Sequence, residues 1–322
     1  MNALLDPGGE PSASGCQPCG GSHHFIAINH HRFHDQGLVA QTVHSVLSAA
    51  KRLAVARPNE GIRIVFFHQP SSLTPSIIER FEGLSDVEML DVPRGSNGEG
   101  LNRQINIARD AGAIYFYRVD ADDPVASERF LRQANLLDQS GADVVGGGLI
   151  YSNLRSGTRF RMMPPRHPKP LHYLANSAML HPALAFRIAS ICERGLRYWS
   201  DRIEDKHLGL QIAQHGLKLV NDPAIYGVYH LNPQARSSIA IAKLNLLLNL
   251  AMIRHTRRFD FLLLAFGIFI ASAILPSQLL RTLRQHLSRL YALPNISSKH
   301  GKDSAVKMEQ EEQADYAWDQ RK

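Results

Sequence analysis

Short apolar runs alternate with longer amphipathic stretches through the first half of the chain. Five runs have the length and composition of buried strands: His24–Asn29, Ile62–Phe67, Val87–Val92, Ile114–Asp120 and Ala142–Ile150. Three stretches between them repeat apolar residues with a helical period: Gln36–Arg57, Leu101–Ala111 and Pro124–Ser140. This alternation predicts an α/β fold with a mostly parallel, Rossmann-like sheet flanked by helices. Ligands of such sheets bind beyond the carboxyl ends of the strands.

Local signals sharpen some of these boundaries. Asp123 is a suitable helix N-cap, Pro124 is favoured in a first helical turn, and Gly141 is a suitable stop signal. In the second half of the chain, Ile203–His215 has a helical pattern, and Arg159–Pro170 is rich in proline and basic residues and predicts a loop. The segment Lys218–Tyr229 has room for one or two strands.

Composition divides the chain into four parts. Residues 1–22 are polar and rich in glycine and proline, which predicts a disordered leader rather than a zinc site at Cys16 and Cys19. Residues 23–235 form the α/β domain, 236–292 a basic helical region, and 293–322 a disordered polar tail. The start of the chain lacks a basic, apolar signal pattern, so we expect a cytoplasmic protein.

The positive charge of the chain is concentrated in one region. The formal net charge is +7, and the segment from Arg236 to Leu290 contains eight basic residues and one acid. The remainder of the chain is therefore neutral, which excludes the chain-wide basic character of many nucleic-acid-binding proteins. We expect no nucleic-acid partner.

The strongest chemical signal is the sequence Arg118-Val119-Asp120-Ala121-Asp122-Asp123 at the end of a predicted strand. Three carboxylates this close are costly to keep ionised unless a cation joins them. Two carboxylates, completed by phosphate oxygens and water, suit Mg²⁺ or Mn²⁺. The alternative is that Asp123 only caps the following helix and the other acids are solvated.

Four sequence blocks resemble family-2 glycosyltransferases with the GT-A fold. The stretch Leu101–Tyr151 is similar to that family's nucleotide-binding half, with an ARMDADD-like strand end and a DVVGG-like strand. His181-Pro182 is similar to its HPS/HPT loop, and Glu204-Asp205 followed by Leu208 is similar to its ED-x-x-L helix. The order and spacing of the blocks fit over about Phe25–Ser237.

The resemblance implies a site for a nucleotide-diphosphosugar donor and a divalent cation, Mn²⁺ or Mg²⁺. Asp122 would bind the metal that bridges the diphosphate, and Asp120 would contact the ribose or the water shell of the metal. Arg103 and Arg118 would counter the charge of the departing diphosphate, or else form ordinary surface ion pairs.

The resemblance also implies a catalytic base. Asp205, beside Glu204, would take the proton of the acceptor hydroxyl in an inverting transfer. The structural alternative is that both acids complement the dipole of the helix that they begin. His181 would shape the site from its loop.

The chain departs from the family pattern at four places, the first being His30-His31-Arg32 in place of the usual Pro-x-Tyr-Asn turn. Phe67-His68-Gln69-Pro70-Ser71 replaces the usual Asp-Asp-Gly-Ser, so His68 or Gln69 would contact the nucleotide base with a different hydrogen-bonding pattern. Tyr229-His230-Leu231-Asn232 replaces Tyr-Arg-x-His, which makes His230 a shifted candidate for a metal ligand. The glycine-rich Gly95–Gly100 lacks a P-loop signature and predicts a turn.

The basic region contains two apolar stretches. Ile239–Ile253 carries Asn245 and Asn249 on one helical face, and Phe261–Leu275 has no charge. A fifteen-residue helix spans about 22 Å, less than the ~30 Å of a bilayer core. With basic residues on both flanks, we expect helices lying on the inner face of the cell membrane, against anionic headgroups. The alternative is a helical pair packed on the α/β domain or on a dimer partner.

These features predict a metal-dependent, inverting glycosyltransferase that is peripheral or monotopic at the membrane. Its acceptor would be a lipid-linked glycan or a polysaccharide. One alternative is a catalytically impaired relative that binds nucleotides or partner proteins at the membrane. Another is a sugar-phosphate nucleotidyltransferase, although His30–Gly37 lacks the glycine-rich basic loop expected of that class.

Overall fold

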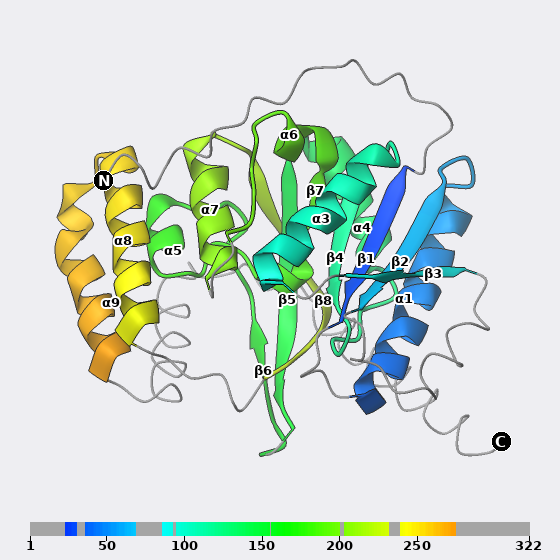
Figure 1. Cartoon of the computed structure of the whole chain (residues 1–322), viewed down its shortest axis with the longest axis horizontal. Helices are drawn as coiled ribbons and strands as arrows, with labels where there is room; N and C mark the ends of the chain where they lie inside the picture. The colour runs from blue at the N-terminus through cyan, green and yellow to red at the C-terminus, as the bar shows by residue number, and fades with distance from the viewer. Residues whose placement is uncertain are drawn as a thin grey trace.

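Figure 1 shows the computed structural model of the whole chain as a mixed α/β protein with a pair of helices at one edge. The structure describes residues 23–30, 36–68, 86–92, 95–154, 156–199, 203–231 and 239–274. The predicted leader and polar tail lie outside the described residues, as does the end of the basic region.

The described strands form one eight-stranded sheet in the order β3-β2-β1-β4-β7-β5-β6, with β8 also paired to β5. The strands are β1 (His24–Asn29), β2 (Ile62–His68), β3 (Val87–Asp91), β4 (Tyr115–Asp120), β5 (Val144–Asn153), β6 (Thr158–Met162), β7 (Ala185–Arg187) and β8 (Leu219–His230). The pairs β1–β2, β1–β4, β2–β3 and β5–β8 are parallel, and β6 and β7 pair antiparallel to their neighbours. The predicted α/β fold with a mostly parallel sheet is confirmed.

Helices cover both faces of this sheet (Figure 1). The helical elements are α1 (Gln36–Ala56), α3 (Asn97–Asp110), α4 (Arg129–Ser140), α5 (Pro170–Leu174), the 3₁₀ turn η2 (His181–Ala183), α6 (Ile188–Cys192), α7 (Glu204–Gln214), α8 (Ile239–Thr256), the 3₁₀ turn η3 (Phe259–Phe261) and α9 (Leu262–Ile274). Helices α1 and α4 pack on one face of the sheet, around buried residues such as Ile26 and Tyr117. Helices α3, α6 and α7 pack on the other face, around Phe25 and Phe116. The alternate residues of each central strand thus enter two separate cores.

Helix α4 begins at Arg129, five residues later than the predicted start at Pro124. The intervening residues pair with β8 instead, because the Ala126 amide donates to the Tyr226 carbonyl at 3.0 Å and the Val228 amide donates to the Pro124 carbonyl at 2.9 Å. A side chain at Gly227 would collide with the Pro124 carbonyl, so glycine permits this approach. The predicted N-cap role of Asp123 is therefore wrong. The predicted stop is confirmed at Gly141, where a φ of +61° favours glycine.

Two predicted irregular segments contain regular structure. The first residues of the predicted loop Arg159–Pro170 belong to strand β6 (Thr158–Met162), which extends the sheet by pairing with the second half of β5. The predicted glycine-rich turn contains the start of α3 at Asn97. The composition of β6 concealed this strand, because Thr158, Arg159 and Arg161 are exposed polar residues at the edge of the sheet.

The basic region forms two helices that pack on the α/β domain. Apolar residues of α8 such as Leu248 and Met252 share a cluster with Leu174 of α5 and Leu210 of α7, and Ala265 of α9 joins the same cluster. The predicted helices are confirmed within the described part of this region. In that part of the chain, none of the helices is long and apolar enough to cross a membrane.

Candidate active site

The candidate site lies where the carboxyl ends of β1 and β4 meet the first turns of α3 and α7. The parallel register places Asn29, the last residue of β1, beside Asp120, the last residue of β4. The amide of Ala121 donates to the Asn29 carbonyl at 3.0 Å and keeps the two strand ends together. This is the edge at which an α/β sheet is expected to bind its ligand.

Arg118 and Asp120 form a buried ion pair at the end of β4. An Nη2 atom of Arg118 donates to Oδ1 of Asp120 at 2.7 Å, and the arginine side chain is only 4% exposed. The Nε and Nη1 groups of Arg118 find no hydrogen-bond acceptor among the described residues. Burial lowers the pKa of Arg118, but the charges of Asp120, Tyr198 and Glu204 outweigh it and raise the pKa overall. A charged guanidinium with two unpaired, buried donors therefore lies beside Asp120, Tyr198 and Glu204, and such donors suit phosphate or carboxylate oxygens.

The turn after β4 concentrates negative charge. Burial raises the pKa of Asp122 to about 7, assisted by the charges of Asp123 and Asp120. Burial likewise raises the pKa of Asp123 to about 6, although hydrogen bonds from His230 oppose the rise. Keeping both groups ionised at neutral pH is unfavourable without an added cation. This is the electrostatic condition under which a divalent metal or a cationic ligand binds best.

His230, at the end of β8, holds this turn in place. Its amide donates to Oδ1 of Asp123 at 2.8 Å, and its Nδ1 lies 2.6 Å from the Asp122 carbonyl oxygen. Burial lowers the pKa of His230, but the hydrogen bonds and charges of Asp123 and Asp122 outweigh it, so the pKa is raised. The histidine thus contacts the acidic turn through Nδ1 and its backbone.

The predicted metal ligands are near each other but do not form a complete protein site. Within the described ranges, no three His, Cys, Asp or Glu side chains are grouped so that they could hold a metal ion by themselves. Asp120 faces Arg118, and the Nδ1 atom of His230 faces the Asp122 carbonyl. The residues present fit a cation of the Mg²⁺ or Mn²⁺ type, which takes one or two carboxylates and completes its shell with phosphate oxygens and water.

A chain of amides connects the two sides of the site. Gln104 donates to Oδ1 of Asn29 at 3.0 Å, and Nδ2 of Asn29 lies 3.5 Å from Oδ1 of Asn97. Asn97 in turn donates to a carboxylate oxygen of Glu204. Burial raises the pKa of Glu204, with Asp205 adding to the rise, while Asn97 and Arg118 oppose it. Asn97 therefore positions Glu204, one of the two predicted catalytic residues, and Asn29 and Gln104 continue the chain behind Asn97. Sequence reasoning did not single out these three amide side chains.

The first turn of α3 supplies Asn97, the last amide of that chain. Ser96 accepts a hydrogen bond from the amide of Glu99 at 3.2 Å, and the Glu99 carboxylate accepts one from the Ser96 amide at 2.9 Å. This capping box starts the helix at Asn97 and points its amino end at the site. The Ser-x-x-Glu spacing was the sequence signal that could have identified the helix start.

His181 and Tyr198 form the buried floor of the site. Nε2 of His181 lies 2.9 Å from the Tyr198 hydroxyl, and the Tyr198 backbone is held by Asn102, which accepts from its amide at 2.7 Å and donates to its carbonyl at 2.9 Å. Burial, with a contribution from Arg118, holds the pKa of His181 well below its usual value. A neutral histidine at this place orients a hydroxyl rather than binding an anion.

Asp205 follows Glu204 in the first turn of α7, and its carboxylate accepts a hydrogen bond from the Lys206 amide at 2.7 Å. The structure thus places both predicted catalytic acids at one helix amino end. The charges of Asp120, Glu204 and Asp205 all raise the pKa of Tyr198, in addition to the larger effect of its burial. Tyr198 therefore lies near the acids of both the β4 end and the first turn of α7.

Two predicted donor-binding residues lie apart from this cluster. Arg103 is exposed on α3, and no hydrogen bond or ion pair joins it to the site residues described above. His68 ends β2, and its Nδ1 lies 3.3 Å from Oδ1 of Asp91 at the end of β3. Asp91, which sequence reasoning missed, supplies an acid at the neighbouring strand end in a chain that lacks the family's usual acid after β2.

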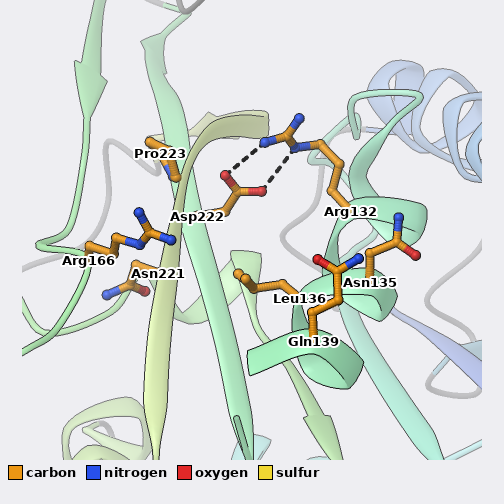
Figure 2. A pocket seen from close by; sticks show the side chains of 8 residues that line it. All are labelled: Arg132, Asn135, Leu136, Gln139, Arg166, Asn221, Asp222 and Pro223. Carbon is orange, nitrogen blue, oxygen red and sulfur yellow. Dashed lines mark hydrogen bonds and ion pairs between the residues drawn. The ribbon is translucent and has the colours of Figure 1, made fainter. Parts of the chain in front are cut away.

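A separate polar pocket lies between α4 and the start of β8 (Figure 2). It is lined by Arg132, Asn135, Leu136, Gln139, Arg166, Asn221, Asp222 and Pro223, so it contains none of the predicted site residues. Arg132 and Asp222 form two hydrogen bonds, of 2.9 and 3.0 Å, across it, as Figure 2 shows. The Tyr226 hydroxyl also donates to Asp222 at 2.7 Å. These paired charges link α4 to β8.

Comparisons with known proteins agree with this arrangement. The family model for glycosyl transferase family 2 matches residues 27–194, more than half of the chain. No curated protein sequence matches the chain.

Solved structures support the fold. A crystal structure of S. aureus TarS 1-349 in complex with UDP-GlcNAc aligns with a TM-score of 0.53 at 12% identity, covering 83% of this chain and 87% of that chain. The same S. aureus TarS fragment in complex with UDP aligns with a TM-score of 0.50 at 15% identity, over the same shares of both chains. At these identities the likeness concerns the fold, which is the GT-A fold. The match over residues 27–194, together with this fold, shows that the chain belongs to glycosyl transferase family 2 and is a glycosyltransferase.

Proposed function

We propose that the enzyme transfers a sugar from a nucleotide-diphosphosugar donor to a hydroxyl group of a lipid-linked or polysaccharide acceptor, with inversion at the anomeric carbon. The observation that carries the proposal is the meeting of two acid pairs at one sheet edge. Asp120 and Asp122 lie at the end of β4, and Glu204 and Asp205 lie in the first turn of α7. The complexes of S. aureus TarS with UDP-GlcNAc and with UDP support a nucleotide-sugar donor on this fold.

The donor diphosphate would lie over the end of β4. Asp122, with Asp120 beside it, would hold a Mn²⁺ or Mg²⁺ ion there, which when bound neutralises charge on the diphosphate. The free Nε–H and Nη1–H donors of Arg118 would bind phosphate oxygens, and the nearby α3 amino end adds a favourable dipole. The bound cation would also relieve the repulsion among the carboxylates of the turn.

Asp205 would act as the base on the acceptor side. Its carboxylate takes the proton of the acceptor hydroxyl while that oxygen forms a bond to the anomeric carbon. The bond from the anomeric carbon to the diphosphate oxygen breaks, and the nucleoside diphosphate leaves with the electron pair. Arg118 donates to the oxygens on which this charge develops. Glu204, held by Asn97, would bind acceptor or sugar hydroxyl groups beside the base.

His68 and Asp91 would contact the nucleotide base from the ends of β2 and β3, where they lie 3.3 Å apart. An imidazole beside a carboxylate presents both donors and acceptors. Base selectivity would then depend on a pair contributed by two strands, so the donor is best identified with a panel of nucleotides.

The test is release of nucleoside diphosphate from a panel of nucleotide sugars, with Mn²⁺ or Mg²⁺ and a mixture of lipid-linked and polysaccharide acceptors. Asp205→Asn should lower kcat by roughly a hundredfold or more while donor affinity, measured by calorimetry, is retained. Asp143→Asn, a change of the same chemistry at the start of β5 and outside the site, is the matched control. The proposal fails if no donor in the panel binds or turns over, or if Asp205→Asn is as active as the control.

A further inference from the structure

Helix α9 presents an apolar face to solvent. Leu263 is 87% exposed, Phe266 46% and Ile270 53%. Their spacing of three and four residues places them on one side of the helix. Large apolar side chains gathered in this way differ from the scattered exposed residues that any protein surface carries, and they indicate a contact surface.

The opposite face of α9 already has its packing partner. Ala265 is fully buried, and it joins the cluster in which Leu248 and Met252 of α8 contact the α/β domain. Figure 1 shows α9 at the outer edge of the molecule, beyond α8. The exposed face is therefore not needed to attach the helices to the domain.

Arginine side chains lie at one end of this apolar face. Arg254, Arg257 and Arg258 are all exposed at the connection between α8 and α9. Asp260 pairs with Arg258 at 2.6 Å, and no ion pair within the described residues neutralises Arg254 or Arg257. The exposed Phe259 lies among these cations, at the amino end of α9.

The outer side of α8 continues the same pattern. Lys243, Leu247 and Arg254 are exposed and lie four and seven residues apart, which places them along one helical face. We define the docking face as the exposed residues Lys243, Leu247, Arg254, Arg257, Phe259, Leu263, Phe266 and Ile270. It combines the apolar stripe of α9 with positive charge at the α8–α9 connection and on the exposed residues of α8.

We propose that the docking face binds the surface of an anionic lipid bilayer, with α9 lying along the interface and its apolar stripe between the lipid chains. Apolar residues flanked by arginines suit a surface that offers hydrocarbon next to negative headgroups. A second copy of the chain is a poorer occupant, because a two-fold contact through this face would bring like charges close together. The inner face of the cell membrane is an anionic surface of this kind.

Docking would also set the height of the active site above the membrane. Helix α8 shares its cluster with Ile203 and Leu210, which flank and belong to α7. The first turn of α7 carries Glu204 and Asp205.

The apolar part of the proposal is tested by flotation of the full chain with lipid vesicles. The vesicles are phosphatidylcholine alone, or phosphatidylcholine with one third phosphatidylglycerol. Unchanged protein should float with the anionic vesicles, and the double variant Leu263→Glu/Ile270→Glu should bind at least about tenfold more weakly. Val55→Glu, which replaces a 77% exposed valine on α1, is the matched control and should float like the unchanged protein.

The charged part is tested with Arg254→Glu against Lys51→Glu, an equal charge change at an exposed position on α1. Arg254→Glu should weaken binding to anionic vesicles about tenfold and leave weak binding to neutral vesicles unchanged, and Lys51→Glu should have little effect. Circular dichroism checks that each variant is folded.

Two results would overturn the proposal. One is equal flotation of the Leu263→Glu/Ile270→Glu variant and the Val55→Glu control. The other is absence of flotation by a chain that forms a dimer in light scattering, when the same double substitution abolishes the dimer. In that case the docking face would bind a second copy of the chain. Because none of these readouts involves sugar transfer, failure here leaves the proposed function untouched.

Discussion

The two ends of the central strands both carry clusters of ionisable groups, and the clusters differ in how their charges are paired. At the amino ends, Nε2 of His24 lies 2.6 Å from Glu60, and Arg57 pairs with Glu60 at 3.1 Å and with Asp138 at 2.7 Å. At the carboxyl ends, Arg118 pairs with Asp120 at 2.7 Å, and Nδ1 of His230 lies 3.6 Å from Asp123. The first cluster sets acids against basic groups, whereas the second crowds three acids into one turn and leaves two donors of Arg118 without an acceptor among the described residues.

The pKa values follow this difference. Burial raises the pKa of Glu60 and of Asp138, but hydrogen bonds from His24, Tyr115 and Arg57 outweigh it, so both acids have a lowered pKa. Burial raises the pKa of Asp122 to about 7, and there the neighbouring acids add to the rise. Acids that are paired with basic groups stabilise the fold. Acids that are crowded next to one another are candidates for binding a cationic ligand.

The largest expected effect is on activity at the carboxyl ends. Asp122→Asn should lower kcat/KM by about a hundredfold to a thousandfold, because the cation that binds the diphosphate would lose a carboxylate ligand. Stability should not fall, since burial already disfavours the ionised form of this group. Activity is measured as nucleoside diphosphate release, and stability by urea unfolding.

Asp138→Asn is the control for that change at the opposite strand ends. It should retain activity per folded molecule. If the two substitutions reduce activity equally, the distinction between the two clusters is wrong.

The second effect concerns the arginine that faces the site. Arg118→Met should lower kcat/KM about a hundredfold, because its unused donors can no longer bind developing charge on the phosphate. Arg118→Lys should recover part of the loss, as it restores the charge without the planar fork. Arg63→Met, which breaks an exposed pair with Glu88, should leave activity unchanged. An Arg118→Met enzyme with normal kcat/KM would exclude a role for this residue in transfer.

The third effect is on stability at the amino ends. Arg57→Met should lower the free energy of unfolding by about 2 kcal/mol, because it removes the partner of two part-buried acids. Activity per folded molecule should be unchanged, since Arg57 is remote from the strand ends that carry the acids. A variant that unfolds normally in urea would contradict the assignment of this cluster to stability.

The smallest expected effect is a difference in pKa between His24 and His230. Burial lowers the pKa of His24 below 6.5, against opposing hydrogen bonding from Glu60, while the acids around His230 raise its pKa above 6.5. The folded pKa of His24 is thus below the unfolded one, so its contribution to stability is complete above pH 6.5 and is lost as pH falls. Nuclear magnetic resonance titration of the two imidazoles in metal-free buffer measures both values. The comparison fails if His24 titrates at higher pH than His230.

Much of the fold could be predicted because the strongest patterns are local. Each of the first strands is a short apolar run. Strand β4 ends at Asp120 as predicted, and α4 ends at Ser140, directly before the predicted stop signal Gly141. The errors arose where tertiary contacts outweigh local signals. Asp123 has the chemistry of an N-cap, but the amide of His230, more than a hundred residues away, takes its carboxylate. The short arginine-rich β6 could not be distinguished from a loop without its partner strand.

The site could be predicted in its acids but not in its supporting groups. Asp120, Asp122, Glu204 and Asp205 stand in motifs, whereas Asn97 and Gln104 are single amides in a helix and have no local signal. Their roles depend on the approach of α3 to β1 and α7.

By itself, the sequence determined that this is an α/β protein with an acidic strand end, a pair of acids at the start of a helix and one basic region. These features depend on local periodicity and composition, which one chain segment contains in full. Only the tertiary structure decided which acids are paired, which donors of Arg118 remain unused and which side of α9 faces solvent. Those outcomes depend on contacts between segments far apart in the chain, and the energy of a charge depends on its surroundings rather than on its sequence neighbours.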